Sequence, residues 1–256
     1  MLVKLEDVAA TYREIQPSAR LRRYVECYWW QNRETPGEYL VLPDGCADIL
    51  FSQSGGEPRG LTTVGLMTTP LRAQAAAAQS YFGVRFRPGM ASAFVPGAEL
   101  LTDEIRSLDD LTGGASARRM FERLAESKSV DEMAGVMDEA LRPLNPPNAG
   151  ERVLHQLASV DISLDDAISE SGLSVRHFRR LCLERAGVSP KYLSRILRFR
   201  KAVQRIATMR ARRSLAQPSW ADFAVACGYY DQAHFIREFQ EFAGCTPGRF
   251  LQSPAA

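Results

Sequence analysis

The sequence has few of the residues that metal centres and disulfide frameworks require. Its three histidines, His155, His177 and His234, all lie after residue 150, and its five cysteines form no C-x-x-C pair. A histidine-ligated metal site or a histidine-based triad in the first 150 residues is therefore excluded. The cysteine pattern suggests neither a zinc knuckle nor a disulfide framework. We expect no metal, no cofactor and mostly buried free thiols.

Long apolar runs and phosphate-binding glycine loops are also missing. No run approaches the roughly 20 apolar residues that span a bilayer, and acidic residues follow the first four positions where a signal peptide would continue with an apolar core. We therefore expect a cytoplasmic protein without membrane contact. No glycine loop suited to a nucleotide is present, and an enzyme ranks last among the functional alternatives, with no catalytic residue assigned.

The charge is divided unequally along the 256 residues. Residues 1–150 carry 16 basic and 20 acidic side chains, a net charge of −4, whereas residues 151–256 carry 16 and 10, a net charge of +6. Between them, 142–150 contains three prolines and a glycine, which are typical of a connection. This length favours two domains, which we place at 1–145 and 150–253, with the C-terminal one as the partner of a polyanion.

The N-terminal part predicts a mainly antiparallel β domain with packed helices. Short runs rich in β-branched and aromatic residues, separated by Pro, Gly and Asp, are typical of strands. Helical spacing follows at Ala115–Glu126 and Val130–Leu141. The expected strands are Val25–Gln31, Tyr39–Leu42, Asp48–Ser52, Leu61–Met67 and Ser80–Arg87. The predicted fold class is α+β, with an all-α domain at the C-terminal end.

The C-terminal part contains an internal repeat. His177-Phe178 and Ala186-Gly187 recur as His234-Phe235 and Ala243-Gly244, each 57 residues later. A repeat of this size in a helical region indicates one supersecondary unit used twice. Each copy has a capping Ser or Asp, a glycine turn and a second helix, the pattern of a helix-turn-helix whose second helix enters the major groove. We place the units at about 163–187 and 219–244.

A helix of about residues 190–209 is predicted between the two units. Pro190 can begin it, and its polar face would expose Arg195, Arg198, Arg200 and Lys201. A helix of this length could hold the two recognition helices about one DNA turn apart.

Gly228-Tyr229, then Phe235-x-Arg237-x-Phe239, then Gly244-x-Thr246-Pro247, resembles the signature of the AraC/XylS family of transcriptional regulators. The resemblance covers about residues 151–251, and Arg198 and Ala202 match the family's linker helix. This sequence departs from the family pattern at Ile168, where the family often has alanine, and at Gln240, where it often has lysine. Arg200, Arg210, Arg212 and Arg213 could supply further phosphate contacts. The positions that the resemblance assigns to base reading are Arg176, Arg179, Arg180, Gln232, Ala233, His234 and Arg237.

The N-terminal part resembles an uncharacterised domain that often precedes AraC-type domains. The motifs that carry this resemblance are Pro43-Asp44-Gly45-Cys46-Ala47-Asp48, Tyr81–Gly89 and Glu99–Asp103. The resemblance implies a sensing or dimerisation role without naming a ligand.

Aromatic side chains in the predicted sheet are candidates for an effector site, because small-molecule pockets are mostly apolar with a few polar groups. Core packing explains most of them equally well. Arg85 alternates with the aromatic residues and leaves an anionic ligand open. The candidate ligand-binding residues are Trp29, Trp30, Tyr81, Phe82 and Arg85. A sensing role for Cys46 and catalytic roles for Asp44 and Asp48 are less favoured, since burial and turn hydrogen bonds explain them.

The sequence therefore predicts a regulator that binds double-stranded DNA in a sequence-specific way, controlled by a small-molecule effector. The alternative is an N-terminal domain that serves only dimerisation or protein contact. RNA polymerase and a second copy of the chain are further candidate partners.

Overall fold

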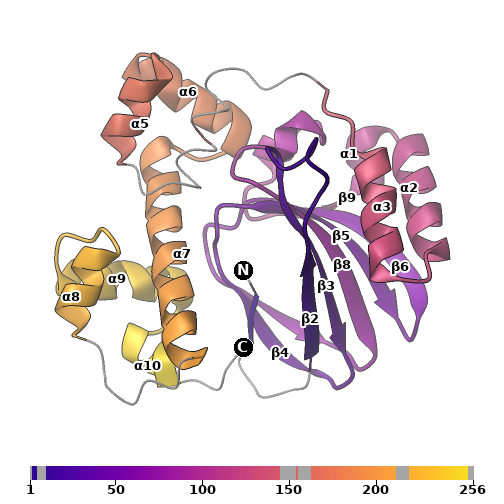
Figure 1. Ribbon diagram of the computed structural model, residues 1–256, viewed down its shortest axis with the longest axis horizontal. Coiled ribbons are helices and arrows are strands. Elements are labelled where there is room, and N and C mark those ends of the chain that lie inside the picture. The colour runs from indigo at the N-terminus through magenta and orange to yellow at the C-terminus, as the bar shows by residue number, and fades with distance from the viewer. Residues whose placement is uncertain (1, 5–9, 145–153, 155–162, 212–218, 253–256) are drawn as a thin grey trace.

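The structure is a computed structural model that describes residues 2–4, 10–144, 154, 163–211 and 219–252. Strands fill the first part of the chain and helices the last, so the predicted α+β fold class is confirmed. Figure 1 shows the helical part beside the sheets. The expected domain boundary falls mostly on residues outside the described ranges and stays a prediction.

The strands form two antiparallel sheets. The larger sheet has the order β2-β3-β8-β5-β6-β9, and the smaller has the order β1-β4-β7. Their bounds are β1 (Leu2–Lys4), β2 (Ala10–Ile15), β3 (Val25–Arg33), β4 (Gly37–Val41), β5 (Ala47–Ser54), β6 (Glu57–Val64), β7 (Leu71–Ala75), β8 (Gln79–Phe86) and β9 (Ile105–Ser107).

Three helices cover one face of the larger sheet: α1 (Leu108–Thr112), α2 (Ala115–Glu126) and α3 (Val130–Ala140) (Figure 1). The ring of Phe121 on α2 packs edge-on against that of Phe51, with centroids 5.7 Å apart. The Tyr28 hydroxyl donates a hydrogen bond of 2.8 Å to Asp138 on α3. The bounds of α2 agree with the prediction from helical spacing.

Alternation along β3 separates its aromatic residues. Successive side chains of a strand point to opposite faces, so Tyr28 and Trp30 lie on the face toward α3 while Trp29 and Gln31 face the smaller sheet. The two tryptophans therefore belong to different environments.

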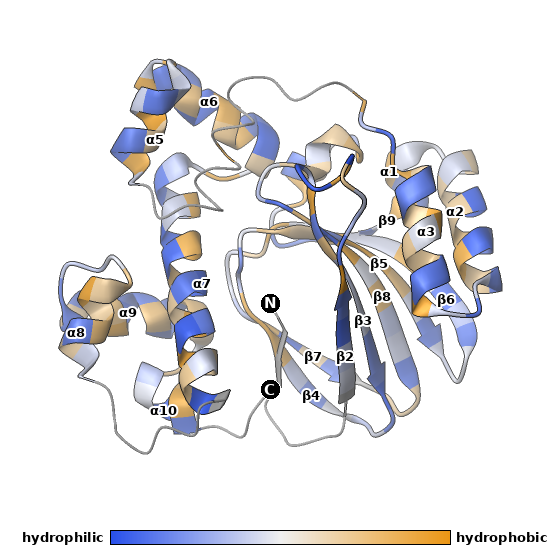
Figure 2. Ribbon diagram, viewed as in Figure 1, coloured by the Kyte–Doolittle hydropathy of each residue, from blue (hydrophilic) through white to orange (hydrophobic). Residues whose placement is uncertain are grey.

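Of the six helices described in the C-terminal part, four begin at the capping residues that the sequence predicts. Side-chain oxygens of Ser163, Ser174, Ser219 and Asp231 accept hydrogen bonds from backbone N–H groups at the helix starts. Figure 2 shows that these helices carry both hydrophobic and hydrophilic residues, as expected for amphipathic helices. The six helices are α5 (Leu164–Ser171), α6 (Val175–Ala186), α7 (Pro190–Ala211), α8 (Trp220–Ala226), α9 (Gln232–Ala243) and α10 (Pro247–Gln252).

Several short or marginal elements were not anticipated, among them β2, β7, β9, α1 and α10. β2 and β9 are edge strands, and edge strands tolerate polar residues that hide the pattern of alternation. The other three span only five or six residues, too few for a period to be recognised. Within the described ranges, no helix is long and apolar enough to cross a membrane.

Candidate nucleic-acid interface

The first candidate recognition helix, α6, presents arginines on its outer face. Phe178 and Cys182 are fully buried on its inner face, which orients the helix. Arg176 and Arg179 are exposed and form no ion pair with any residue that the structure describes. Arg180 is also exposed, but its guanidinium lies 3.6 Å from Glu184, one turn further along the helix. Two guanidinium groups near the start of α6 are thus available to an external anion.

The second recognition helix, α9, is positioned by Phe235, Phe239 and Phe242, which are fully buried. Gln232, Ala233 and Arg237 are exposed on its outer face. His234 is only one-third exposed; its ring packs edge-on against Tyr229 and lies 3.7 Å from the Glu238 carboxylate. A base contact by His234 would have to compete with these internal contacts.

A buried carboxylate fastens α9 to α7. Glu238 is 4 % exposed and accepts hydrogen bonds from Arg195 at 2.8 Å and from Arg198 at 2.9 and 3.1 Å. The Arg198 guanidinium also lies 4.7 Å from the centre of the Tyr229 ring. The sequence predicted that Arg198 is exposed on the polar face of α7. In the structure its guanidinium donates hydrogen bonds to Glu238, which also balances its charge, so Arg198 holds two helices together.

Arg200, the other arginine predicted on the outer face of α7, contacts the N-terminal domain. Its side chain is 15 % exposed and pairs with Glu26. It also donates to the Cys46 sulfur at 3.4 Å and to the Asp44 carbonyl oxygen at 3.5 Å. Arg200 therefore joins the linker helix to the Pro43–Asp48 motif, and its exposure to DNA is small.

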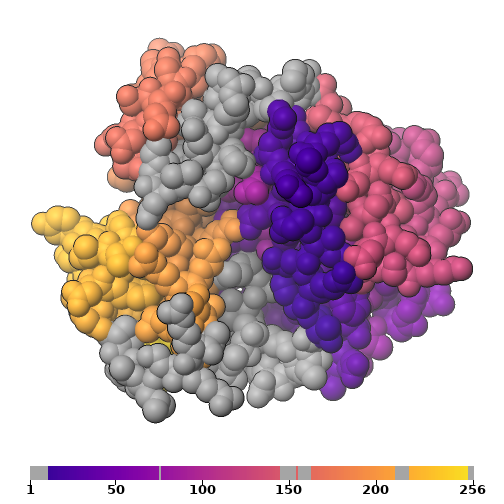
Figure 3. All heavy atoms as spheres, viewed as in Figure 1, coloured from indigo at the N-terminus to yellow at the C-terminus, as the bar shows by residue number. Residues whose placement is uncertain are grey.

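Glycines of both domains mark further close contacts between them. Gly187 ends α6 with a φ of +73°, and a Cβ atom there would lie 2.3 Å from the Glu99 carbonyl oxygen and 2.4 Å from the Thr102 hydroxyl oxygen. A Cβ atom on Gly45 would lie 3.3 Å from Leu197 of α7. The space-filling view shows the two parts of the chain packed against each other (Figure 3). The motifs of the N-terminal resemblance thus face the DNA-binding part.

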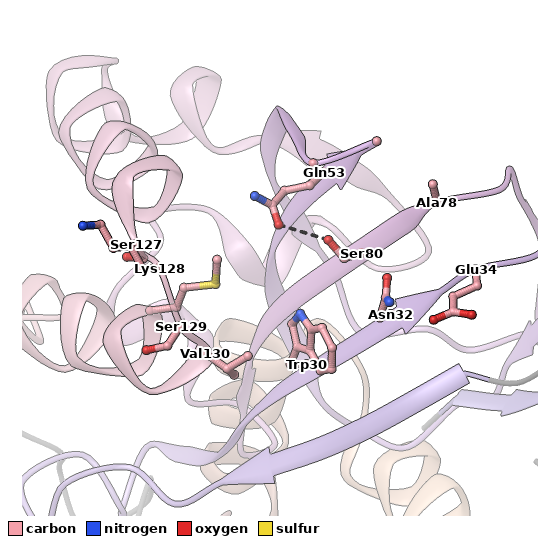
Figure 4. A pocket seen from close by; sticks show the side chains of 13 residues that line it. Trp30, Asn32, Glu34, Gln53, Ala78, Ser80, Ser127, Lys128, Ser129 and Val130 are labelled. Atoms are coloured by element: carbon pink, nitrogen blue, oxygen red, sulfur yellow. Dashed lines mark hydrogen bonds between the residues drawn. The ribbon is translucent and has the colours of Figure 1, made fainter.

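The candidate ligand residues divide into three groups. Trp29, Tyr81 and Arg85 line a cavity of about 100 Å³ between the two sheets. Trp30 lies on the other face, in an open groove of about 480 Å³ beside the start of α3, near the hydrogen-bonded pair Gln53 and Ser80 (Figure 4). Phe82 is 2 % exposed, within the hydrophobic core.

Cys46 is buried, and burial raises the pKa of its thiol well above the ordinary value. The thiol is therefore protonated at neutral pH, and thiolate is the reactive form. We expect Cys46 of the folded protein to resist iodoacetamide at neutral pH and to react once the protein is unfolded in urea, as measured by mass spectrometry of its peptide. Rapid alkylation of the folded protein would support the sensing role that the sequence left open.

No cluster of His, Cys, Asp and Glu residues in the described ranges has the geometry to hold a metal ion. Asp44 and Asp48, weighed as catalytic carboxylates, instead lie 3.7 Å from the Arg85 guanidinium.

Two contributors to the interface were not identified from the sequence. Glu238 occurs three residues after Phe235 and one before Phe239, on the inner stripe of α9, and an acidic residue on such a stripe is the signal that could have identified it. Glu26 gives no such signal, because its partner Arg200 lies 174 residues away.

Comparison with known families gives two matches, on separate parts of the chain. Residues 13–105 match the family described as "Domain of unknown function (DUF6597)", and residues 167–253 match the family described as "Helix-turn-helix domain". No curated protein matches the chain.

Solved structures give distant similarities. A DNA-binding transcriptional dual regulator from Escherichia coli K-12 is 24% identical over 43% of this chain and 96% of its own, with a TM-score of 0.32. ToxT from Vibrio cholerae is 10% identical over 98% of this chain and 95% of its own, with a TM-score of 0.38. ToxT with a bound unsaturated fatty acid has the same identity, coverages of 98% and 94%, and a TM-score of 0.40.

The two family matches and the two exposed recognition helices lead to one assignment. Residues 13–105 carry a domain of the DUF6597 family, and residues 167–253 carry an AraC-type helix-turn-helix DNA-binding domain.

Proposed function

We propose that the protein reads promoter DNA with α6 and α9 and that its DUF6597 domain controls this binding in response to a small-molecule effector. The observation that supports DNA reading by α6 is that Arg176 and Arg179, near the start of this helix, are exposed and form no ion pair with any described residue. The first residues of a recognition helix are those that contact base edges in the major groove.

The length of α7 supports simultaneous binding by both units. The helix has 22 residues, which extend about 33 Å at ~1.5 Å per residue. One turn of DNA measures about 34 Å. Both recognition helices could therefore enter successive major grooves on one face of the duplex, and the +6 charge of residues 151–256 favours the phosphates.

The proposed DNA contacts are not equal. Arg176 and Arg179 are proposed to read bases, with Gln232, Ala233 and Arg237 as the corresponding set on α9. The guanidinium of Arg180 already forms an ion pair with Glu184, so we assign to Arg180 a phosphate contact and not a base contact. Arg198 and Arg200 are proposed to act indirectly, by positioning α9 and by contacting the N-terminal domain.

Selection of bound fragments from random double-stranded DNA with the full-length protein tests the proposal. We expect one enriched sequence and an affinity whose logarithm falls linearly with the logarithm of the salt concentration, since counterions leave the neutralised phosphates. Retention of no DNA at low salt would contradict it.

Arg179→Ala is expected to lose base preference as well as affinity. A lost bidentate contact to a base edge costs about 1–3 kcal/mol at one position. The measurement is a competition between the selected site and its single-base variants. Arg118→Ala is the matched control, because this arginine is exposed on α2 and pairs only locally with Glu122. Equal weakening on every sequence would make Arg179 a phosphate contact.

A second candidate function is favoured by the cover of α1–α3 over one sheet face, which leaves α2 and α3 as the outer layer of the domain. An N-terminal domain that only dimerises would bind a second copy there or recruit RNA polymerase. Concentration-dependent sedimentation together with no response to any small molecule would favour this alternative.

A further inference from the structure

A large aliphatic side chain is exposed at the start of α6. Val175 is the first residue of this helix and is 68 % exposed. The helix cap does not use it, because the Ser174 hydroxyl accepts the backbone N–H of His177. Leu173, on the other side of Ser174, packs against the hydrophobic core. Val175 thus contributes neither to this cap nor to the core formed by the described residues.

Helical geometry places Val175 beside the arginines that we propose to read bases. Val175 and Arg179 are four residues apart, so they lie on the same side of α6, one turn from each other. Arg176 follows Val175 directly, and all three side chains are exposed. The start of α6 therefore presents an aliphatic group and two guanidinium groups to the same external partner.

The internal repeat gives Val175 an equivalent in the second unit. Residues 57 positions apart correspond, so Val175 matches Gln232, which is the first residue of α9 and is also exposed. The first residues of a recognition helix are those that contact base edges. Two units that dock in the same way would therefore bring both side chains to the bases of successive grooves.

We propose that Val175 selects a thymine in the groove that α6 occupies, by packing its methyl groups on the C5-methyl group of the base. Among the four bases, thymine alone presents a methyl group in the major groove, and apolar side chains contact it there. The other bases present donors and acceptors that valine cannot satisfy, so their desolvation would cost free energy. This specificity rests on the proposed function, since it requires α6 to enter the major groove.

The spacing along α6 places this thymine close to the base that Arg179 reads. One turn of helix between Val175 and Arg179 rises about 5.4 Å. Successive nucleotides of one DNA strand are about 3.4 Å apart along the axis. The thymine therefore lies within about two base pairs of the position that Arg179 contacts.

The test uses the full-length protein and the site selected from random DNA. Each thymine of the site is replaced in turn by deoxyuridine, which keeps the base pairing and lacks only the C5-methyl group. We expect one replacement to lower the affinity about fourfold, the effect of losing one buried group of the size of CH₂. Val175→Ser should bind both forms of the site equally, because serine has no methyl group. Val225→Ser should keep the fourfold difference; Val225 is 65 % exposed on α8, outside both recognition helices, and is the matched control.

Two outcomes would overturn the thymine contact: replacement of every thymine by deoxyuridine without loss of affinity, or a fourfold difference that persists in Val175→Ser. Both variants should keep the melting temperature of the unchanged protein, because substitutions of exposed residues seldom alter stability. A lost difference then reports the contact and not unfolding. DNA binding without any effect of the methyl group would remove this inference alone, whereas retention of no DNA would remove the proposed function together with it.

Discussion

Replacing Glu238 with alanine is expected to destabilise the C-terminal part by about 3 kcal/mol. Removing one partner of a buried ion pair leaves the other charge uncompensated, at a cost of roughly 3–5 kcal/mol when both are fully buried. Arg195 and Arg198 are about one-quarter exposed, so water can solvate part of their charge, and we expect the lower end of this range. Urea unfolding followed by circular dichroism of the helices measures the loss.

Glu241→Ala is the matched control. Glu241 also pairs with Arg195, but half of its side chain is exposed, and such exposed pairs contribute less than about 1 kcal/mol. Glu238→Ala should in addition weaken DNA binding at temperatures where the protein stays folded, because α9 is no longer fixed on α7. Equal, small losses for both variants would show that Glu238 does not hold the second unit in place.

Gly187→Ala is expected to disturb the contact between the first helix-turn-helix unit and the N-terminal domain. An added Cβ atom would overlap the Glu99 carbonyl oxygen, and backbone atoms can yield only if the two segments separate. Overpacking of this kind costs about 1–3 kcal/mol. The left-handed φ of Gly187 adds roughly 1 kcal/mol of conformational strain.

Gly244 provides an internal control at the equivalent position of the second unit. Its φ is +70°, and no described atom lies within 4 Å of a Cβ placed there. Gly244→Ala should therefore lose only the conformational part of the stability. Faster amide hydrogen exchange around residues 99–102 in Gly187→Ala, but not in Gly244→Ala, would locate the difference at the contact. The same melting temperature for both variants would contradict it.

The two predictions also test how the domains communicate. Glu238 holds α9 on α7, while Gly187 and Arg200 hold α6 and α7 against the N-terminal domain. If this second contact restrains the first unit, Gly187→Ala should change DNA affinity without the effector.

The sequence by itself determined the local structure of the DNA-binding part. The bounds of α6, α8 and α9 follow from Ser174, Ser219 and Asp231 as caps and from the glycines behind them, since caps and left-handed glycines act within a few residues. The spacing of Phe235 and Phe239 determined the buried face of α9 for the same reason. These signals need no knowledge of distant parts of the chain.

Only the tertiary structure decided what the outward arginines do. Arg176 and Arg198 are both basic residues on polar faces, but Arg176 stays exposed while Arg198 meets Glu238, 40 residues away. The surroundings of Trp29 and Trp30 also depend on the tertiary structure. The two residues are neighbours in the sequence, but Trp29 lines the cavity between the sheets and Trp30 lines the groove beside α3, because different layers cover the two sides of β3. Periodicity tells which residues share a face, whereas the partner of that face depends on contacts between segments far apart in the chain.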